Sequence, residues 1–210
     1  MNVELVWITP DAQQVVGHCA RVSNPANQDN PEIKGLLGYC ICKGHWSIFE
    51  MASMCISITT TRSISAQLLR HSSFSFQEFS QRYAQVQETD MPELRRADPR
   101  NRQNSIDDLP SDLTVDYYNR ILDHFDDGFC LYEDMLADGI AKECARAVLP
   151  MNVRTKLYMS GNLRSWLHYI DLRCGNGTQL EHQQIAEGIK EIFTQECPTI
   201  AHAMWPDCLN

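Results

Sequence analysis

The chain has 210 residues, 43% of them hydrophobic, and a formal net charge of −9 at pH 7. This length suffices for one substantial hydrophobic core, so we expect a single domain over residues 1–210. The negative charge argues against general binding of nucleic-acid polymers or anionic membranes, which requires a basic surface. No apolar run approaches the roughly 20 residues of a membrane span, and the N-terminus has neither a basic nor an apolar leader segment, so we expect a soluble, cytoplasmic protein.

The N-terminal segment alternates between strand and helix patterns. Residues 2–9, NVELVWIT, are expected to form a strand, and a helix is expected after Asp11, which can cap it. A second helix is expected to start with Asn30 as N-cap and Pro31 in its first turn, and to end before Gly44.

The middle of the chain contains a strand pattern, a short helix and a polar insertion. Residues 51–61 are rich in β-branched side chains and predict a strand, and residues 62–71 predict a short helix. Residues 88–112 contain almost nothing apolar and predict a loop insertion; long loops of this kind are often functional, and disorder is the equally weighted alternative. Residues 113–139 carry apolar side chains at helical spacing and predict one long amphipathic helix. Further helical patterns lie at 141–149, 162–174 and 179–197.

The nine cysteines form neither a disulfide pattern nor a metal-binding pattern. Their number is odd, and no two are spaced as C-x-x-C. Most have apolar neighbours, among which a thiol behaves as a small hydrophobic group. We therefore expect buried, reduced thiols and no metal, with zinc as the weaker alternative. The cysteines are Cys19, Cys40, Cys42, Cys55, Cys130, Cys144, Cys174, Cys197 and Cys208.

Residues 70–83, RHSSFSFQEFSQRY, combine charged and aromatic side chains in a short stretch. If this stretch is extended, Glu78, Ser80 and Arg82 lie on one face together with Phe74 and Phe76. A carboxylate accepts an imide N–H and an arginine binds phosphate in a bidentate manner, which together suit a pyrimidine nucleotide. The alternative is a simple Glu78 to Arg82 ion pair on an exposed edge.

A second polar cluster lies on the helix expected at 162–174. Asn162 and Arg173 are eleven residues apart, close to three helical turns, so they lie on one side of a helix. Arg164 and His168 are four residues apart on a different side. The pattern suits a helix between two flat or charged ligands, and the alternative is a surface helix with solvated polar positions.

The stretch at 70–83 resembles the signature R-H-R-x-x-S-x-N-E-x-S-x-R-Y of the flavin-dependent thymidylate synthases (ThyX). Three other segments resemble family motifs in the same order: GHWSIFEMA from Gly44, ARAVLP from Ala145, and GNLRSWLHYIDLR from Gly161. The signature positions that match are Arg70, His71, Ser75, Glu78, Ser80, Arg82 and Tyr83. The resemblance spans most of the chain and implies the α+β ThyX-like fold, an antiparallel sheet flanked by helices with a helix-rich C-terminal half.

The resemblance implies reductive methylation of dUMP to dTMP. The implied carbon donor is 5,10-methylenetetrahydrofolate, and the implied hydride source is FAD reduced by NADPH. Family members are homotetramers with active sites between subunits, which implies that arginines from neighbouring chains converge on the anionic ligands.

Site residues follow from the same resemblance, position by position. Arg173 is the implied catalytic residue, because a fixed guanidinium beside the uracil favours ionisation at N3 and makes C5 a better nucleophile. No enzyme nucleophile is implied. The dUMP-binding residues are Gln67, Arg70, Glu78, Phe79, Ser80, Gln81, Arg82, Arg146 and Arg173. The FAD-binding residues are His45, Ser47, Arg70, His71, Ser72, Glu78, Asn162, Arg164 and His168.

Several positions depart from the family pattern. Ser72 replaces the second arginine of the signature and Gln77 its asparagine, while Ile48 and Met51 replace a proline and a histidine. A missing arginine removes a charge-assisted contact worth about 1.5 to 3 kcal/mol. We therefore expect FAD binding that is weaker than usual or anchored differently. Two alternatives remain: a related reaction such as dUMP hydroxymethylation, and a nucleotide- or flavin-binding protein that has lost catalysis.

Overall fold

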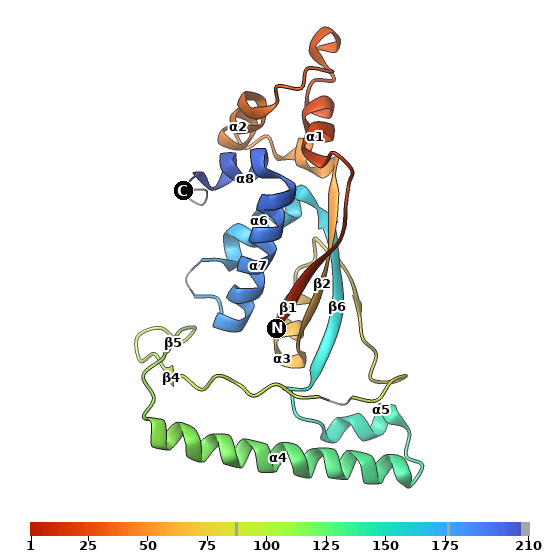
Figure 1. Ribbon diagram of the computed structural model, residues 1–210, viewed down its shortest axis with the longest axis vertical. Helices are drawn as coiled ribbons and strands as arrows, with labels where there is room; N and C mark the ends of the chain where they lie inside the picture. The colour runs from red at the N-terminus through yellow and green to blue at the C-terminus, as the bar shows by residue number, and fades with distance from the viewer. Residues whose placement is uncertain (87, 176, 207–210) are drawn as a thin grey trace.

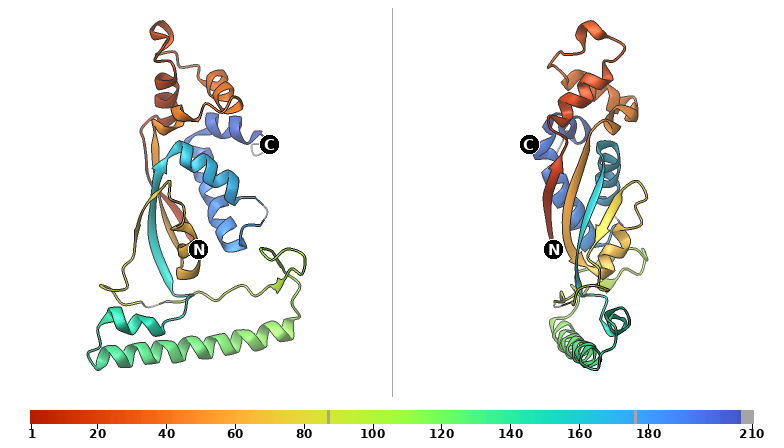
Figure 2. Two further views of the ribbon diagram at one scale, coloured as in Figure 1. Left: turned by 180° about the vertical axis from the view of Figure 1, so that it is seen from behind. Right: turned by 90° about the vertical axis from the view of Figure 1, so that its right-hand side faces the viewer.

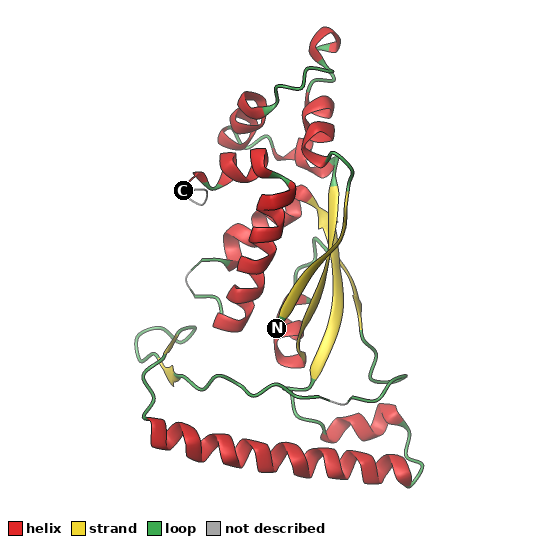
Figure 3. Ribbon diagram, in the orientation of Figure 1, coloured by secondary structure: helices red, strands yellow, loops and turns green. Residues whose placement is uncertain are grey.

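The computed structural model describes residues 1–86, 88–175 and 177–206, which form an α+β fold (Figure 1). Figure 3 separates a narrow twisted sheet from the helices around it. No helix in these described ranges is both long and apolar enough to cross a lipid bilayer. The expected fold class is confirmed.

A four-stranded sheet forms the centre of the fold, with strand order β1-β2-β6-β3 and every neighbouring pair antiparallel. Its strands are β1 (Asn2–Ile8), β2 (Ser53–Thr61), β6 (Arg154–Asn162) and β3 (Ser75–Glu78). The register of β2 and β6 pairs Ser53 with Asn162 and Thr61 with Arg154. The strands expected near residues 2–9 and 51–61 are confirmed.

The central strand β6 was not expected, although its sequence carries a strand signal. Thr155, Leu157 and Met159 are buried, and Lys156 and Tyr158 between them are exposed. This alternation is the pattern of a strand with one covered face. The two basic residues at its start, Arg154 and Lys156, are exposed positions of this alternation.

Helices α6 (Leu163–Arg173) and α7 (Leu180–Glu196) cover one face of the sheet, as both views in Figure 2 and the view in Figure 1 show. Trp166 is fully buried and donates its indole N–H to the carbonyl oxygen of Met54 at 3.0 Å, which ties α6 to β2. Gly161 on β6 admits the ring of Phe74, because a Cβ at this glycine would lie 2.6 Å from a ring carbon. The opposite face of the sheet carries the exposed side chains of β6.

Short helices lie at the end of the sheet where β2 begins. They are α1 (Ala12–Ala20), η1 (Pro25–Asn27), α2 (Lys34–Cys42), η2 (Trp46–Glu50) and α8 (Pro198–Met204).

The expected helix caps in this region are only partly confirmed. Gly44 has φ +69° just after α2 and donates its N–H to the carbonyl oxygen of Ile41, as expected of a helix end. Asp11 precedes α1, but its side chain makes no capping bond. The expected start of α2 is wrong, because Asn30 accepts a hydrogen bond from the backbone N–H of Glu32 in a turn, and the helix begins only at Lys34.

Helix α3 (Arg62–Leu68) follows β2 as expected. The prediction that the signature stays extended through Arg82 is wrong, because β3 ends at Glu78 and residues 81–83 form a turn. Only four residues of the signature pair with β6.

The insertion and the long helix lie at the far end of the sheet. The insertion contains only the two-residue strands β4 (Arg96–Ala97) and β5 (Ser105–Ile106). Helix α4 (Ser111–Ala137) is long, as expected, yet only Phe125 and Tyr132 on it are buried. The short helices α5 (Lys142–Ala145) and η3 (Arg146–Val148) lie beside it (Figure 1).

The cysteine expectation is correct for only part of the chain. The eight described cysteines are free thiols, and Cys40, Cys55 and Cys197 are buried. Burial raises the pKa of each of these three thiols. Cys42, Cys130 and Cys144 are exposed, which differs from the expectation. Cys208 lies outside the described residues.

Candidate active site

Arg173 and His71 form the centre of a polar cluster between α3, α6 and α7. Arg173 donates from Nε to Nε2 of His71 at 3.0 Å. Burial lowers the pKa of His71, and the positive charges of Arg173 and Arg70 lower it further. The imidazole is therefore neutral at pH 7 and accepts the bond. Because its partner is uncharged, and because no carboxylate in the described part of the chain forms an ion pair with Arg173, the guanidinium keeps its full positive charge.

Beside this pair, hydrogen bonds link four further side chains into a row. Nδ1 of His182 lies 3.4 Å from Oε1 of Gln67, and its Nε2 lies 3.1 Å from the hydroxyl oxygen of Tyr169. Gln67 donates from Nε2 to Oε1 of Gln179 at 2.6 Å. The Tyr169 ring also makes an edge contact with the His71 ring, at 4.9 Å between centroids. We refer to Tyr169, His182, Gln67 and Gln179 as the relay; its histidine and tyrosine are buried, Gln67 is half-buried and Gln179 is exposed.

Two members of the relay, His182 and Tyr169, are not among the site residues that the sequence analysis expected. Burial lowers the pKa of His182 to about 4, with smaller contributions from the charges of Arg173 and His71. Burial also raises the pKa of Tyr169, so both groups are neutral at pH 7. A signal was available, because His182 lies on the buried side of α7 with Ile185, Ala186 and Ile189, where a polar ring needs partners.

Glu78 is held by two partners that are distant in the sequence. Its carboxylate forms an ion pair with Nη1 of Arg62 at 2.6 Å and accepts a bond from the hydroxyl of Thr155 at 2.9 Å. The alternative of a Glu78 to Arg82 ion pair is wrong, since Arg82 instead binds Glu143 on α5.

Arg82 and Arg146 meet at Glu143 on the outside of the molecule. Arg82 donates from Nε to the Glu143 carboxylate at 2.9 Å, and Nε of Arg146 donates to the backbone carbonyl of Glu143 at 3.3 Å. The Arg82 and Glu143 side chains are 56% and 50% exposed, so water screens this pair strongly. These three residues form what we call the surface arginine pair and its carboxylate.

Three further members of the expected dUMP set lie between Glu78 and Arg82. Phe79 is exposed, and the Ser80 hydroxyl accepts a weak bond from the backbone N–H of Arg82 at 3.4 Å. Gln81 is only 7% exposed, and its Nε2 has no hydrogen-bond partner in the described ranges. A buried amide without a partner is a place where a ligand acceptor would fit.

Several members of the expected FAD set lie where η2 meets α6. Arg164 forms an ion pair with Glu50, and the ring of His168 lies 4.6 Å from the ring of Trp46. Also at η2 are the exposed side chains of His45 and Ser47.

Asn162, a member of the expected FAD set, also has a structural role. It is the N-cap of α6, where its Oδ1 accepts the backbone N–H of Ser165 at 2.9 Å. Arg173 is at the other end of this eleven-residue helix, so the two side chains do not meet.

Arg70 and Ser72 flank His71 in the turn before β3, and both are exposed. The Arg70 side chain makes no hydrogen bond or ion pair with any residue that the structure describes. A free guanidinium at this position suits a phosphate group. Ser72 offers only a neutral hydroxyl at the position where the family signature has its second arginine.

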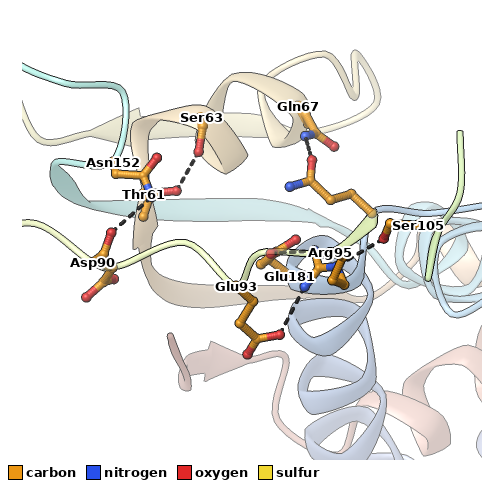
Figure 4. A network of polar contacts seen from close by, with 10 residues as sticks. Thr61, Ser63, Gln67, Asp90, Glu93, Arg95, Ser105, Asn152 and Glu181 are labelled. Carbon is orange, nitrogen blue, oxygen red and sulfur yellow. Dashed lines mark hydrogen bonds and ion pairs between the residues drawn. The ribbon is translucent and has the colours of Figure 1, made fainter. Parts of the chain in front are cut away.

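The insertion contacts α7 next to the relay. This contact was not predicted from the sequence. Arg95 forms ion pairs with Glu181 at 2.6 Å and with Glu93 at 3.0 Å (Figure 4). Glu181 lies two residues from Gln179, so this contact brings the insertion beside the relay. A cavity of about 450 Å³ lies there, lined by residues of the insertion and by Thr178, Gln179, Leu180 and Gln183.

Within one chain, the expected site residues therefore fall into separate groups. The relay, His71 and Arg173 lie between the sheet and its helices. Of the surface arginine pair, Arg82 lies in the turn after β3 and Arg146 lies on η3, and both contact Glu143 on α5, the short helix beside α4 (Figure 1). No hydrogen bond or ion pair between described residues joins the two groups.

Comparison with known proteins gives a consistent result. Residues 4–199 match the family model described as "Thymidylate synthase complementing protein". The chain is 51% identical over 191 residues to a flavin-dependent thymidylate synthase of Synechocystis, covering 90% of this chain and 88% of that protein. It is 50% identical over 213 residues to a probable flavin-dependent thymidylate synthase of Paramecium bursaria Chlorella virus 1, covering 97% and 99%.

A solved structure agrees with these sequence matches. The UMP/dUMP methylase PolB of Streptomyces cacaoi, bound with 5-Br dUMP, superposes with a TM-score of 0.86 at 28% identity. The match covers 96% of this chain and 93% of that chain.

Proposed function

Because this chain belongs to the thymidylate synthase complementing protein family, which includes flavin-dependent thymidylate synthases, we propose that it converts dUMP to dTMP. The carbon donor is 5,10-methylenetetrahydrofolate, and NADPH is the source of reducing equivalents, which reach the substrate through FAD. The observation that carries this proposal is the pairing of Arg173 with the neutral imidazole of His71.

Arg173 serves as the electrostatic catalyst. A carboxylate partner would cancel most of the guanidinium field, whereas the neutral His71 orients the side chain and leaves its charge available. A fixed cation beside the uracil stabilises negative charge that develops on the ring when N3 ionises. C5 then carries more electron density and attacks the one-carbon unit.

The remaining dUMP ligands supply cations and hydrogen-bond donors. Arg82 and Arg146 are placed to bind phosphate, which must displace Glu143 from Arg82. A nucleotide phosphate carries close to two negative charges at pH 7, so it competes well with a single exposed carboxylate. The unpartnered Nε2 of Gln81 is a further donor in this region.

The donors around Arg70 and η2 fit a flavin dinucleotide. Arg70 is free to bind its pyrophosphate. At η2, the side chains of His45 and Ser47 are exposed, and Arg164 and His168 reach this helix from α6. Bound FAD, once reduced, supplies the hydride for the reaction. Ser72 provides no charge, so the cation contact to FAD depends on Arg70 and Arg164.

We further propose a homotetramer with active sites shared between subunits. Two features support this assembly. The surface arginine pair lies far from Arg173 within one chain, and α4 exposes several apolar side chains. These are Leu113, Val115, Tyr117, Leu122 and Leu131. Light scattering should give four times the 24.0 kDa chain mass, and a monomer at micromolar concentration would contradict the assembly.

Product analysis tests the proposed reaction. The purified protein is incubated with FAD, NADPH, methylenetetrahydrofolate and dUMP, and nucleotides are separated by chromatography. We expect dTMP. Release of 5-hydroxymethyl-dUMP would instead identify the hydroxymethylation alternative, and NADPH oxidation without any nucleotide product would indicate a binding protein that has lost catalysis.

A further inference from the structure

His182 is buried beside the proposed uracil site, yet no motif includes it. The side chain is 0% exposed, and both ring nitrogens have partners. The pKa of about 4 means that the ring is neutral at pH 7 and carries one proton on one of its two nitrogens. Which nitrogen carries it decides the direction of every hydrogen bond in the relay.

Two directions connect the same four residues. In one, the Tyr169 hydroxyl donates to Nε2 of His182, and Nδ1–H donates to Oε1 of Gln67. In the reverse, Nε2–H donates to the tyrosine oxygen, and Gln67 turns its amide to donate to Nδ1. Such amide and tautomer choices follow from satisfying the whole network.

Burial of Tyr169 decides between them. Tyr169 is 2% exposed, and His182 is the only described residue with which its hydroxyl forms a hydrogen bond. In the reverse direction its O–H would point at no acceptor, and an unpaired buried donor costs about 1 to 3 kcal/mol. In the forward direction every relay group is satisfied, so the structure assigns the Nδ1–H tautomer to His182.

We propose that His182 and Tyr169 are positioning residues that lock the carboxamide of Gln67, so that it presents an N–H donor to an oxygen of the pyrimidine nucleotide. This inference rests on the proposed function, in which Gln67 contacts dUMP. With Oε1 held by His182 and one N–H held by Gln179, the second N–H of Gln67 remains for the ligand. A flipped amide would place its carbonyl oxygen against the nucleotide oxygen, which is repulsive.

The Tyr169→Phe variant removes the hydroxyl and keeps the ring contacts with His71, Phe74 and Trp166. His182 then loses the donor that fixes its tautomer, and Gln67 can adopt both orientations. We expect the dUMP dissociation constant of the FAD-loaded variant, measured by calorimetry, to rise about tenfold. KM for dUMP should rise more than kcat falls.

Tyr132→Phe is the matched control. Tyr132 is also a buried tyrosine, at 1% exposure, but it lies on α4 and its hydroxyl has no partner among the described residues. The dUMP dissociation constant should stay at the wild-type value in this variant. A general loss of packing would affect thermal stability in both variants but dUMP binding in neither.

A direct readout of the proton complements the binding data. Solid-state NMR of ¹⁵N-histidine-labelled protein should show a single neutral tautomer of His182, with the proton on Nδ1, in the wild type, and a mixture of the Nδ1–H and Nε2–H tautomers in Tyr169→Phe. An unchanged dUMP dissociation constant in Tyr169→Phe, or a wild-type proton on Nε2, overturns the inference and leaves the proposed function standing. Wild-type protein that does not bind dUMP overturns the proposed function itself.

Discussion

The arginines of the proposed site occupy two regions that hold their charges in opposite ways. Arg173 lies inside the fold against a neutral histidine, while Arg82 lies on the surface against the carboxylate of Glu143. Packing fixes the first before any ligand arrives. The second is neutralised by an exposed partner that a phosphate can replace. In the proposed site, the catalytic charge would therefore be the half-buried one that packing fixes, and the phosphate-binding charge the one at the surface whose partner can be exchanged.

Arg173→Ala should produce the largest effect on turnover, because it removes the interior arginine of this comparison. Loss of a single preorganised electrostatic contact typically lowers turnover by about two to three orders of magnitude. Formation of dTMP gives the rate, and the visible absorbance of the bound flavin should be little changed. Arg120→Ala on the exposed face of α4 is the control. Loss of flavin with turnover intact would contradict the assignment.

Lowering the pH should show how strongly the fold favours the neutral form of the His182 ring. His182 has a folded pKa of about 4 and an ordinary value of 6.5 when unfolded. Above pH 6.5 both states are neutral; as the pH falls toward 4, only the unfolded chain binds the proton, so folding is destabilised by about 3 kcal/mol. Arg173 and His71 face the ring and oppose its charging.

Thermal unfolding at a series of pH values measures this effect. His182→Asn should flatten the pH dependence between about pH 6.5 and pH 4 relative to wild type. His202→Asn, at an exposed position on α8, should leave it unchanged. Parallel pH curves for the wild type and His182→Asn would show that the buried ring does not titrate as described.

Ser72→Arg should sharpen the comparison by adding a third kind of cation, one that is exposed like Arg82 but has no carboxylate partner to displace. Position 72 is exposed beside Arg70, so a guanidinium there can bind FAD without a competing carboxylate. A charge-assisted contact predicts a flavin dissociation constant lower by about ten- to a hundredfold. Flavin fluorescence titration measures it, with Ser73→Arg as the neighbouring control. Equal tightening in both variants would indicate a nonspecific charge effect.

Glu143→Gln should give the smallest effect and tests the surface half. Removing the carboxylate frees Arg82 for phosphate, and exposed ion pairs are worth about 0.2 to 1 kcal/mol, so dUMP affinity should rise about two- to fivefold. Glu133→Gln on α4 serves as the charge-matched control. Weaker dUMP binding in Glu143→Gln would mean that Glu143 helps to bind the nucleotide.

The sequence predicted the elements whose signals are local. The β-branched run of β2 and the apolar spacing of α4 both appear within a single window of residues, and both elements formed as expected. Asn30 misled because a side chain that caps helices also closes turns. Strand β6 was missed although its signal is local, because Arg154 and Lys156 are the exposed members of its alternation with Thr155 and Leu157.

The candidate site was predicted only as far as the family motifs reach. Partners such as Glu143 for Arg82 and Arg62 for Glu78 lie 61 and 16 positions away, and no short pattern encodes such pairings. The relay has the same character, since His182 meets Gln67 across 115 positions. Long-range pairs of this kind arise from the fold and are invisible to spacing rules.

Gly161 lies outside the stretch at residues 70–83 but limits how closely that stretch can pack on β6. Phe74 rests where the side chain of any other residue at this β6 position would stand, and Phe74 ends the turn that carries Arg70 and His71. A single methyl group at position 161 would act as a wedge under that turn, lifting His71 away from Arg173. The spacing between the Arg173 guanidinium and the neutral His71 ring is thus limited by an atom that the protein lacks.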